Sequence, residues 1–445
     1  MKEEILAKIR EAGVVGAGGA GFPTHVKVSS AAQRIIVNGA ECEPLLRVDQ
    51  QLLALMTERV IKGLEIVMEL AGAAEGIIAL KGKYRDAVRS LEKAVQGKPF
   101  RIHILGDFYP AGDEHVIVRE VTGEVVPQGG IPLKVDCIVT NVETLVNIAE
   151  AVRGNPVTEK YLTIAGEVPE PVTLKLPIGT TMAEAFRIAG LTNFGEMMVI
   201  EGGPMMGKIV RDLDQPITKT TKGLIILPPE HPLIVKREMP LELILRQAKA
   251  ACIQCRYCTD LCPRFLLGHH LEPHKIMRAV KHLDGQEEPV KMALACSECG
   301  VCEQYACIMG LSPRRVNAVL KQELLKNGIR PEGPPLNQEV HLLQGDRQIP
   351  VKRLISRLGL TKYDKPAPLA AAGYTIGHVR IKLHQHVGAP CRPLVSIGQK
   401  VSKGEMIAEI PEKSLGANIH ASISGIITEV SDSIAITSGE GSEML

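Results

Sequence analysis

Apolar positions in the first third of the chain alternate between short runs and longer helical patterns. The runs have the length and β-branched content of buried parallel strands, and they lie at residues 34–40, 76–81, 100–105 and 136–142. Between them, residues 51–72 and 84–95 carry apolar side chains three and four positions apart, which is the spacing of a helix packed on a sheet. This alternation predicts an α/β layer domain over residues 1–156.

The pattern changes after residue 156, and further units follow. Residues 157–238 hold short strand-like runs around one helical stretch and predict a small α+β module. Residues 239–328 hold helical segments around clustered cysteines. A stretch rich in Pro and Gly marks a linker over 329–364, and the short strands with Gly and Pro turns of 365–445 predict a small all-β unit. We therefore expect a multidomain protein of mixed α/β and α+β class.

Composition and charge exclude several classes of protein. The 445 residues carry a net charge of +2 and 3% aromatic residues, with no tryptophan, which argues against a nucleic-acid-binding surface. No apolar run approaches the roughly 18 residues of a membrane span. The first residues lack the apolar centre of a signal peptide and predict an ordinary helix. Clustered thiols without such a leader indicate a reducing, cytoplasmic compartment.

Eight of the eleven cysteines form two runs of four, and their spacing narrows the chemistry most. The first run is C-x2-C-x2-C-x3-C-P, and the second is C-x2-C-x2-C-x4-C. Three close cysteines plus a distant fourth are typical of [4Fe-4S] clusters, and in two-cluster ferredoxins the fourth cysteine of each run binds the other cluster. We therefore expect one cluster on Cys252, Cys255, Cys258 and Cys307, and a second on Cys296, Cys299, Cys302 and Cys262.

Structural zinc is the alternative interpretation of these cysteines. Zinc sites favour C-x2-C knuckles of two cysteines each, which the two runs fit poorly. The second run also departs from the ferredoxin pattern, since Ile308 stands in place of the proline. The scattered thiols Cys42, Cys137 and Cys391 are expected to be packed residues.

A glycine-rich loop lies near the start of the chain. Gly16, Gly18 and Gly21 satisfy G-x-G-x-x-G, but a helical pattern precedes them where a dinucleotide fingerprint requires a strand. The loop still lets backbone N–H groups approach a phosphate or a flat ring closely, and Lys27 adds a cation. A loop that needs its glycines only for turning is the alternative.

Two carboxylates follow the first predicted strand, in the sequence Asn38-Gly-Ala-Glu41-Cys-Glu43-Pro. Open α/β sheets bind ligands at the ends of their parallel strands, and Glu41 and Glu43 could accept hydrogen bonds from ribose hydroxyls there. Helix capping is the alternative role for both side chains.

Together these two patches resemble the flavin-binding subunit of respiratory complex I, in which a glycine loop and an E-x-E strand end hold FMN and NADH. Further motifs are similar to loops of the C subunit of Rnf electron-transport complexes, and they lie at residues 109–114, 121–123, 127–130 and 141–144. The order of the units most resembles the cobalamin (corrin) reductases of propanediol-utilisation microcompartments, over essentially the whole chain. The Rnf subunit is similar to a permutation that puts the β-barrel unit first.

The resemblance implies site residues position by position. Those that it places at FMN are Gly16, Gly18, Gly19, Lys27, Asn38, Glu41, Gly112, Asp113, Asn141 and Thr144. Phe22 and Glu43 would contact the nicotinamide nucleotide. Ala17, Ala40 and Val28 stand where complex I has arginine, aspartate and tryptophan, and these departures weaken the nucleotide site more than the flavin site.

The resemblance extends to the two β-rich units. Residues 176–186 look like the soluble-ligand-binding β-grasp (SLBB) module, for which packing is the default role. The C-terminal unit resembles the barrel-sandwich hybrids of lipoyl and biotinyl carriers. Ser414 stands where the carrier lysine would lie, and Lys413 is one position away. A docking module is therefore expected rather than a swinging arm.

The implied activity is electron transfer. By resemblance, NAD(P)H gives hydride to FMN, and electrons leave singly through two [4Fe-4S] clusters to a cob(II)alamin corrinoid, held by a partner such as an adenosyltransferase. No acid–base catalytic residue is predicted. The resemblance places the enzyme in the cytoplasm, with a microcompartment interior as the narrower expectation. It leaves open whether NADH, NADPH or ferredoxin is the donor, and whether the chain contacts a shell or its own copies.

Two other hypotheses stay open. The chain could be a peripheral subunit of a membrane electron-transport complex, although a C-terminal barrel unit favours the reductase. It could also be a non-enzymatic iron–sulfur shuttle whose α/β domain has lost its flavin.

Overall fold

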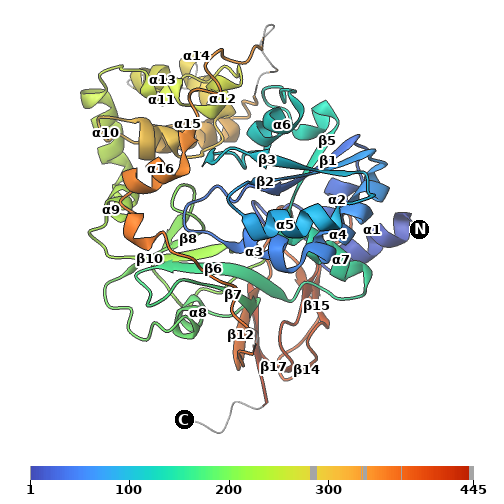
Figure 1. Ribbon diagram of the computed structural model, residues 1–445. Helices are drawn as coiled ribbons and strands as arrows, with labels where there is room; N and C mark the ends of the chain where they lie inside the picture. The colour runs from blue at the N-terminus through green and yellow to red at the C-terminus, as the bar shows by residue number, and fades with distance from the viewer. Residues whose placement is uncertain (1, 281–287, 332, 334–337, 372, 440–445) are drawn as a thin grey trace.

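The computed structural model describes residues 2–280, 288–331, 333, 338–371 and 373–439. Its first unit is built on a parallel four-stranded sheet in the order β3-β2-β1-β5 (Figure 1). The strands are β1 (Arg34–Gly39), β2 (Glu75–Lys81), β3 (Phe100–Leu105) and β5 (Cys137–Asn141). All four predicted strands are therefore confirmed.

Helices cover both faces of this sheet. They are α1 (Lys2–Glu11), α2 (Thr24–Val28), α3 (Val48–Leu55), α4 (Thr57–Ala71), α5 (Arg85–Ala94), α6 (Glu114–Thr122), the short η1 (Pro132–Val135) and α7 (Val142–Val152). Successive side chains of a strand point to opposite faces, so Ile35 and Val37 of β1 pack with α4 and α7, whereas Ile36 packs with α6. The stretch expected to be one helix over 51–72 is divided between α3 and α4, with Met56 at the break.

The second unit is a mixed five-stranded sheet in the order β7-β6-β10-β8-β9. Its elements are β6 (Glu159–Gly166), β7 (Val172–Pro177), α8 (Met182–Ile188), β8 (Met198–Glu201), β9 (Lys208–Val210) and β10 (Gly223–Leu227). The one helix of this unit packs its apolar face on the sheet, and Phe186 of α8 is fully buried there among Leu162, Leu174 and Leu224. The expected small α+β module is confirmed at this level.

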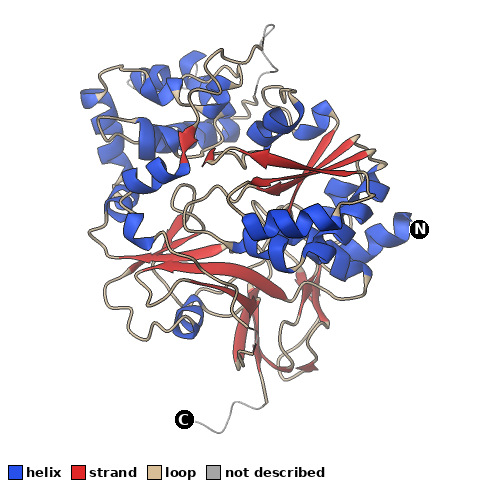
Figure 2. Cartoon of the chain, viewed as in Figure 1, coloured by secondary structure: helices blue, strands red, loops and turns tan. Residues whose placement is uncertain are grey.

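The third unit is helical and carries both cysteine runs (Figure 2). Its elements are α9 (Pro232–Glu238), α10 (Leu241–Ala251), α11 (Tyr257–Asp260), α12 (Pro263–Leu266), α13 (Pro273–Ala279), α14 (Glu288–Lys291), η2 (Met292–Ala295), η3 (Val301–Ala306) and α15 (Pro313–Lys326). The helical segments predicted over 239–328 are present in this unit, and residues 281–287, after α13, lie outside the described residues.

The stretch expected to be a linker contains ordered elements. β11 (Ile349–Pro350) pairs antiparallel with β4 (Phe108–Tyr109) of the first unit, and α16 (Val351–Arg357) and η4 (Thr361–Tyr363) follow it. Leu354 and Leu360 are fully buried in a cluster with residues of the first three units. Part of 329–364 therefore ties these units together, while residues 332 and 334–337 lie outside the described residues.

The C-terminal unit consists of two small sheets, in the orders β12-β18-β17-β14 and β13-β15-β16. The strands are β12 (His378–Lys382), β13 (Arg392–Pro393), β14 (Lys400–Val401), β15 (Met406–Glu409), β16 (Ile419–His420), β17 (Gly425–Val430) and β18 (Ser433–Thr437). The buried Lys219 joins three units, since its Nζ donates hydrogen bonds to the carbonyl oxygens of Gly13, at 2.7 Å, and Asn418, at 2.6 Å.

Candidate functional site

A cavity of about 660 Å³ opens at the carboxyl ends of β1 and β5, and we call it the glycine-loop cavity. The loop between α1 and α2 forms one wall, and the turn that leads into α6 forms another. Open α/β sheets bind ligands at this edge. Nine predicted residues line the cavity: Gly16, Gly18, Gly19, Phe22, Lys27, Asn38, Gly112, Asn141 and Thr144.

Two of its glycines lie where an added side chain would be crowded by its neighbours. A Cβ added to Gly18 would lie 2.9 Å from Nδ2 of Asn141, and one added to Gly112 would lie 3.2 Å from Sγ of Cys42. Bare backbone therefore forms these parts of the wall and allows a flat ring or a phosphate to approach closely. The residues present thus fit a flavin cofactor.

Buried polar contacts hold the glycine loop in place. The N–H of Ala17 donates to Oγ1 of Thr144 at 3.0 Å, and Nζ of Lys160 donates to the carbonyl oxygen of Ala17 at 3.2 Å. Nδ2 of Asn141 lies 3.1 Å from both carboxylate oxygens of Asp49. Asp49 and Lys160 belong to no motif and each has polar neighbours in the sequence, so the sequence offered no signal for them.

Two buried ion pairs complete this support and connect the first two units. Lys160 pairs with Glu143, both side chains being 1% exposed, and Lys222 pairs with Asp49. Burial lowers the pKa of Lys160, and Glu143 opposes that shift. Burial alone would also lower the pKa of Lys222, but the Asp49 and Glu41 carboxylates raise it above its ordinary value. The Lys222 amino group is therefore held as a cation beside Asp49.

The mouth of the cavity is partly exposed. Nζ of Lys27, on α2, lies 3.0 Å from Oε1 of Glu114 at the start of α6, so an ion pair joins two sides of the opening. Phe22 and Ile131 are exposed large apolar residues among its lining side chains. Val26 is a third, so a ligand that entered here would meet one ion pair and three exposed apolar side chains.

Three predicted residues are not among the side chains that line the cavity, and each is engaged elsewhere. Glu41 accepts hydrogen bonds from the N–H groups of Asp49, at 2.9 Å, and Gln50, at 3.3 Å, so it caps the start of α3. Burial, together with the Asp49 carboxylate, raises the pKa of Glu41 to about 7. For Glu41 the structure therefore shows the alternative role, helix capping.

Glu43 and Asp113 bind other units of the protein. Glu43 accepts hydrogen bonds at 2.9 Å from the N–H groups of Met205 and Met206, in the loop between β8 and β9. Asp113 caps α6 and accepts two hydrogen bonds from Arg264 of the helical unit, at 2.6 and 3.0 Å. Spacing along the chain could not reveal these contacts, because they depend on how distant units pack.

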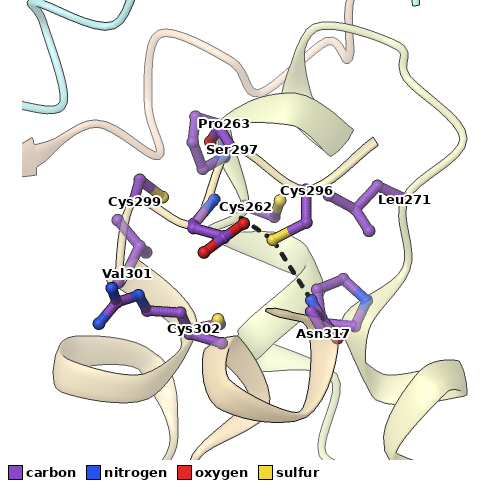
Figure 3. A pocket seen from close by; sticks show the side chains of 13 residues that line it. Cys262, Pro263, Leu271, Cys296, Ser297, Cys299, Val301, Cys302 and Asn317 are labelled. Atoms are coloured by element: carbon purple, nitrogen blue, oxygen red, sulfur yellow. Dashed lines mark hydrogen bonds between the residues drawn. The ribbon is translucent and has the colours of Figure 1, made fainter. Parts of the chain in front are cut away.

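The cysteines gather at two sites, each with three cysteines from one run and one from the other. The inner cysteine site is lined by Cys262, Cys296, Cys299 and Cys302 (Figure 3). The outer cysteine site is lined by Cys252, Cys255, Cys258 and Cys307. These are the two sets of four that the spacing predicted.

The local backbone of the two sites is repeated. The residues two and four positions after the first cysteine are left-handed in both runs: Gln254 and Arg256, with φ of 56° and 75°, and Glu298 and Gly300, with φ of 58° and 83°. Such turns bring three closely spaced thiols to one side of the loop. Within the described residues, no three His, Cys, Asp or Glu side chains converge on a single ion. Three thiols from one loop with a fourth from the other run are the arrangement that [4Fe-4S] clusters use in two-cluster ferredoxins.

Burial makes a metal partner necessary for these thiols to ionise. It raises the pKa of Cys258 and of Cys262 to about 12. Thiolates bind iron, and the positive charge of the metal offsets the cost of burying them. The donor set therefore fits iron–sulfur clusters.

The inner cysteine site lies against the first unit. Oη of Tyr109 donates to the carbonyl oxygen of Cys299 at 2.7 Å. Arg264, two residues after Cys262, holds Asp113, whose neighbour Gly112 lines the glycine-loop cavity. Short covalent and hydrogen-bonded paths therefore join this cavity to the inner cysteine site.

Comparison with known families defines the class of this protein. Residues 9–150 match the Nuo51 FMN-binding domain, residues 251–312 the 4Fe-4S dicluster domain, and residues 369–444 the RnfC barrel sandwich hybrid domain. With the cavity and the two cysteine sites, these matches show a flavin and iron–sulfur oxidoreductase that transfers electrons. No helix in the described parts of the chain is long and apolar enough to span a bilayer.

Curated relatives then give the family. The chain is 46% identical to cobalamin reductase PduS of Citrobacter freundii, over 98% of this chain and 97% of the relative, and 45% identical to that of Salmonella typhimurium, over 97% and 95%. The chain belongs to the PduS family of cobalamin reductases.

More distant relatives share parts of the architecture. The C subunit of the proton-translocating ferredoxin:NAD(+) oxidoreductase complex of Clostridium ljungdahlii is 34% identical over 59% of this chain and 56% of its own length. A solved structure of an NAD+-reducing [NiFe]-hydrogenase superposes with a TM-score of 0.50 at 21% identity, over 75% of this chain and 64% of the other, which shows a shared fold.

Proposed function

We propose that this enzyme takes electrons from NAD(P)H and delivers them singly to a corrinoid at the cob(II)alamin level. The observation that carries the proposal is a flavin-sized cavity joined to two four-cysteine sites within one chain. The names of the PduS relatives, cobalamin reductases, support the corrinoid as acceptor.

The proposed cofactors are one FMN and two [4Fe-4S] clusters. The inner and outer cysteine sites would hold one cluster each. Of the nine predicted residues that line the glycine-loop cavity, Phe22 would face the nicotinamide nucleotide and the other eight would bind FMN. FMN, when bound, supplies the conversion between two-electron and one-electron transfer. Glu41, Glu43 and Asp113 then act as supports, since their carboxylates hold α3, the β8–β9 loop and Arg264.

Anaerobic stopped flow tests the electron path directly. We expect NADH or NADPH to bleach the flavin first and to reduce free cob(II)alamin afterwards, with reduced ferredoxin compared as a third donor. A protein that releases no flavin on heat denaturation would contradict the proposal and favour the iron–sulfur shuttle.

A pair of glycine variants tests the cavity. In Gly18→Ala the new Cβ would meet Asn141 at 2.9 Å, whereas in Gly345→Ala, outside the cavity, it would meet nothing within 4 Å. We expect the flavin content to fall much further in Gly18→Ala than in the control Gly345→Ala variant. Equal flavin content in both would count against this placement of FMN.

The finer architecture is part of the same proposal. The unit over 157–238 would be a β-grasp (SLBB-like) module, and the barrel-sandwich unit a docking module, which the contacts of the buried Lys219 with Gly13 and Asn418 support. The limits 1–156, 157–238, 239–328, 329–364 and 365–445 stay predictions, as do the adenosyltransferase partner and a microcompartment location.

A role in a membrane complex is the second candidate, favoured by the 34% identity to the C subunit of a proton-translocating complex. Affinity capture of the chain from its native cells distinguishes the two. Recovery of membrane proteins would support this candidate, and recovery of a corrinoid protein would support the reductase.

A further inference from the structure

We infer that the surface around the outer cysteine site is where a protein acceptor with an acidic face docks to take electrons from this enzyme. The inference rests on the proposed function, because it assigns the exit point of the same electron path. In each step the reduced enzyme loses one electron and the acceptor gains it, so no bond, proton or further reactant is involved.

Exposed apolar side chains form the rim of the outer cysteine site. Ile253 and Met309 line the site and are 58% and 45% exposed. Their neighbours Tyr257 and Ile308 are 50% and 53% exposed, and Cys255 itself is exposed. A group of large apolar residues on a surface commonly marks an interaction site, whereas apolar residues exposed singly are ordinary.

The inner cysteine site offers no comparable surface. All four of its cysteines are buried, and Tyr109 and Asp113 of the first unit contact its loops. An acceptor protein can therefore come close to the outer site but is kept away from the inner one. The packing gives the path a direction, from the glycine-loop cavity to the inner site and then to the outer site.

The charge around this rim selects the kind of partner. On α10, α11 and α13 and the loops between them, five exposed cationic side chains outnumber a single exposed anionic one, Glu242. The cationic residues are Arg246, Lys249, Arg256, Lys275 and Arg278. Two of the five form ion pairs with partly buried carboxylates, Arg256 with Asp260 and Lys275 with Glu272, and within the described part of the chain the other three do not. A basic surface around an apolar centre attracts an acceptor whose redox group is surrounded by carboxylates, and the attraction weakens as salt is added.

The opposite end of the molecule supplies matched controls. In Figure 1 the helices α11 and α13 lie at the top, whereas β14 and β17 of the C-terminal unit lie at the bottom. Ile397, next to β14, is 67% exposed, and Lys400 of β14 is exposed as well. An apolar and a cationic residue can therefore be changed there without touching the proposed surface.

The test uses the full chain, loaded with its cofactors and reduced with dithionite, so that it does not depend on the donor. The probes are cytochrome b5, whose haem edge is acidic, cytochrome c, whose haem edge is basic, and free cob(II)alamin. The variants are Ile253→Ser/Met309→Ser and Arg246→Glu/Lys249→Glu, with Ile397→Ser and Lys400→Glu as controls. Iron content is measured for each.

We expect the wild type to reduce cytochrome b5 faster than cytochrome c at low salt. Both double variants should reduce cytochrome b5 about tenfold more slowly, and the loss in the charge-reversal variant should vanish at high salt. The controls, and the reduction of free cob(II)alamin by every variant, should match the wild type. The apolar variant could lose iron, because Ile253 is next to Cys252. The charge-reversal variant changes residues three or more positions from any cysteine, so its rate with cytochrome b5 still tests the docking surface.

Three outcomes would overturn the inference: wild-type rates with cytochrome b5 in both double variants, a preference for cytochrome c, or an equal loss with free cob(II)alamin. The last would mark a site for a small molecule. Failure of the proposed function looks different, because the wild type would then leave its flavin oxidised in NADH and NADPH.

Discussion

The inner and outer cysteine sites share one local design and differ in their surroundings. Left-handed residues occupy the same two places in both runs, so the loops present their thiols alike. The inner site is enclosed by contacts with the first unit, whereas the outer site keeps Cys255 exposed. A repeated sequence motif therefore sets the ligands, while packing decides which of the two sites is enclosed and which is exposed.

Removal of one cysteine ligand from either site should have the largest effect. We expect Cys302→Ser and Cys255→Ser each to lower the iron content from about eight atoms per chain to about four. Both variants should lose the reduction of a protein acceptor. They should differ in EPR spectra after NADH is added, because the inner cluster can still be reduced in Cys255→Ser, whereas the outer cluster stays oxidised in Cys302→Ser. If NADH still reduces the outer cluster in Cys302→Ser, the proposed order of electron transfer, from the inner to the outer cluster, is wrong.

The buried ion pair between Arg264 and Asp113 should contribute more to stability than an exposed ion pair near the outer site. Arg264→Ala leaves the Asp113 carboxylate buried without its cation, and such a loss lowers the free energy of unfolding by about 3–5 kcal/mol. The matched control is Arg347→Ala, whose partner Asp260 lies 3.4 Å away with both side chains 24% exposed. That pair should contribute about 0–1 kcal/mol. Urea unfolding measures both, and equal losses would remove the distinction.

Hydrogen bonds to sulfur provide a smaller contrast between the two sites. Nδ2 of the buried Asn317 donates to Sγ of Cys296 at 3.6 Å, and Nε2 of the exposed Gln254 donates to Sγ of Cys252 at 3.1 Å (Figure 3 shows the first). We expect Asn317→Ala to cost about 1–3 kcal/mol of stability and Gln254→Ala no more than about 0.5. Potentiometric EPR should show a lower midpoint potential for the inner cluster in Asn317→Ala, because a donor to sulfur stabilises the reduced state.

The ion pair between Asp113 and Arg264 also predicts how stability depends on pH. Burial alone would raise the pKa of Asp113, but Arg264 holds it below the ordinary value of 3.8. A carboxylate with a lowered pKa stabilises the fold above its unfolded pKa and loses that contribution as the pH falls through its folded pKa. In Arg264→Ala the effect of burial is no longer opposed by the guanidinium, so the pKa of Asp113 should rise and the carboxyl should take up a proton at a higher pH than in the wild type. The destabilisation caused by Arg264→Ala should therefore be largest near pH 7 and shrink as the pH falls through this raised pKa. A difference in stability that stays the same from pH 7 to pH 3 would contradict this assignment.

Much of the fold could be predicted because its signals are local. Apolar runs located all four strands of the first sheet, and cysteine spacing paired the thiols as the two sites group them. The linker was less predictable. Its Pro and Gly residues predicted an irregular segment and gave no signal for β11. This strand forms only because it pairs with β4, more than two hundred residues away in the sequence.

The candidate site divides in the same way. The glycine loop could be identified because only glycine allows backbone to form the wall beside Asn141. Glu41 and Glu43 were predicted to bind ligands, yet both accept hydrogen bonds from backbone N–H groups, those of α3 and of a loop in the second unit. A carboxylate satisfies either partner equally well, so its sequence position alone does not distinguish them.

The order of residues was enough to predict the four strands of the first sheet and the grouping of the eight cysteines, because periodicity and ligand spacing act over a few residues. The flavin was predicted from the resemblance of two sequence patches to a known family. The packing of the units, by contrast, determines that Asp49, Lys160 and Lys222 support the glycine loop and that Asp113 holds Arg264. It also determines which cysteine site is enclosed. These features depend on desolvation and on contacts between units, and both exist only once the chain has folded.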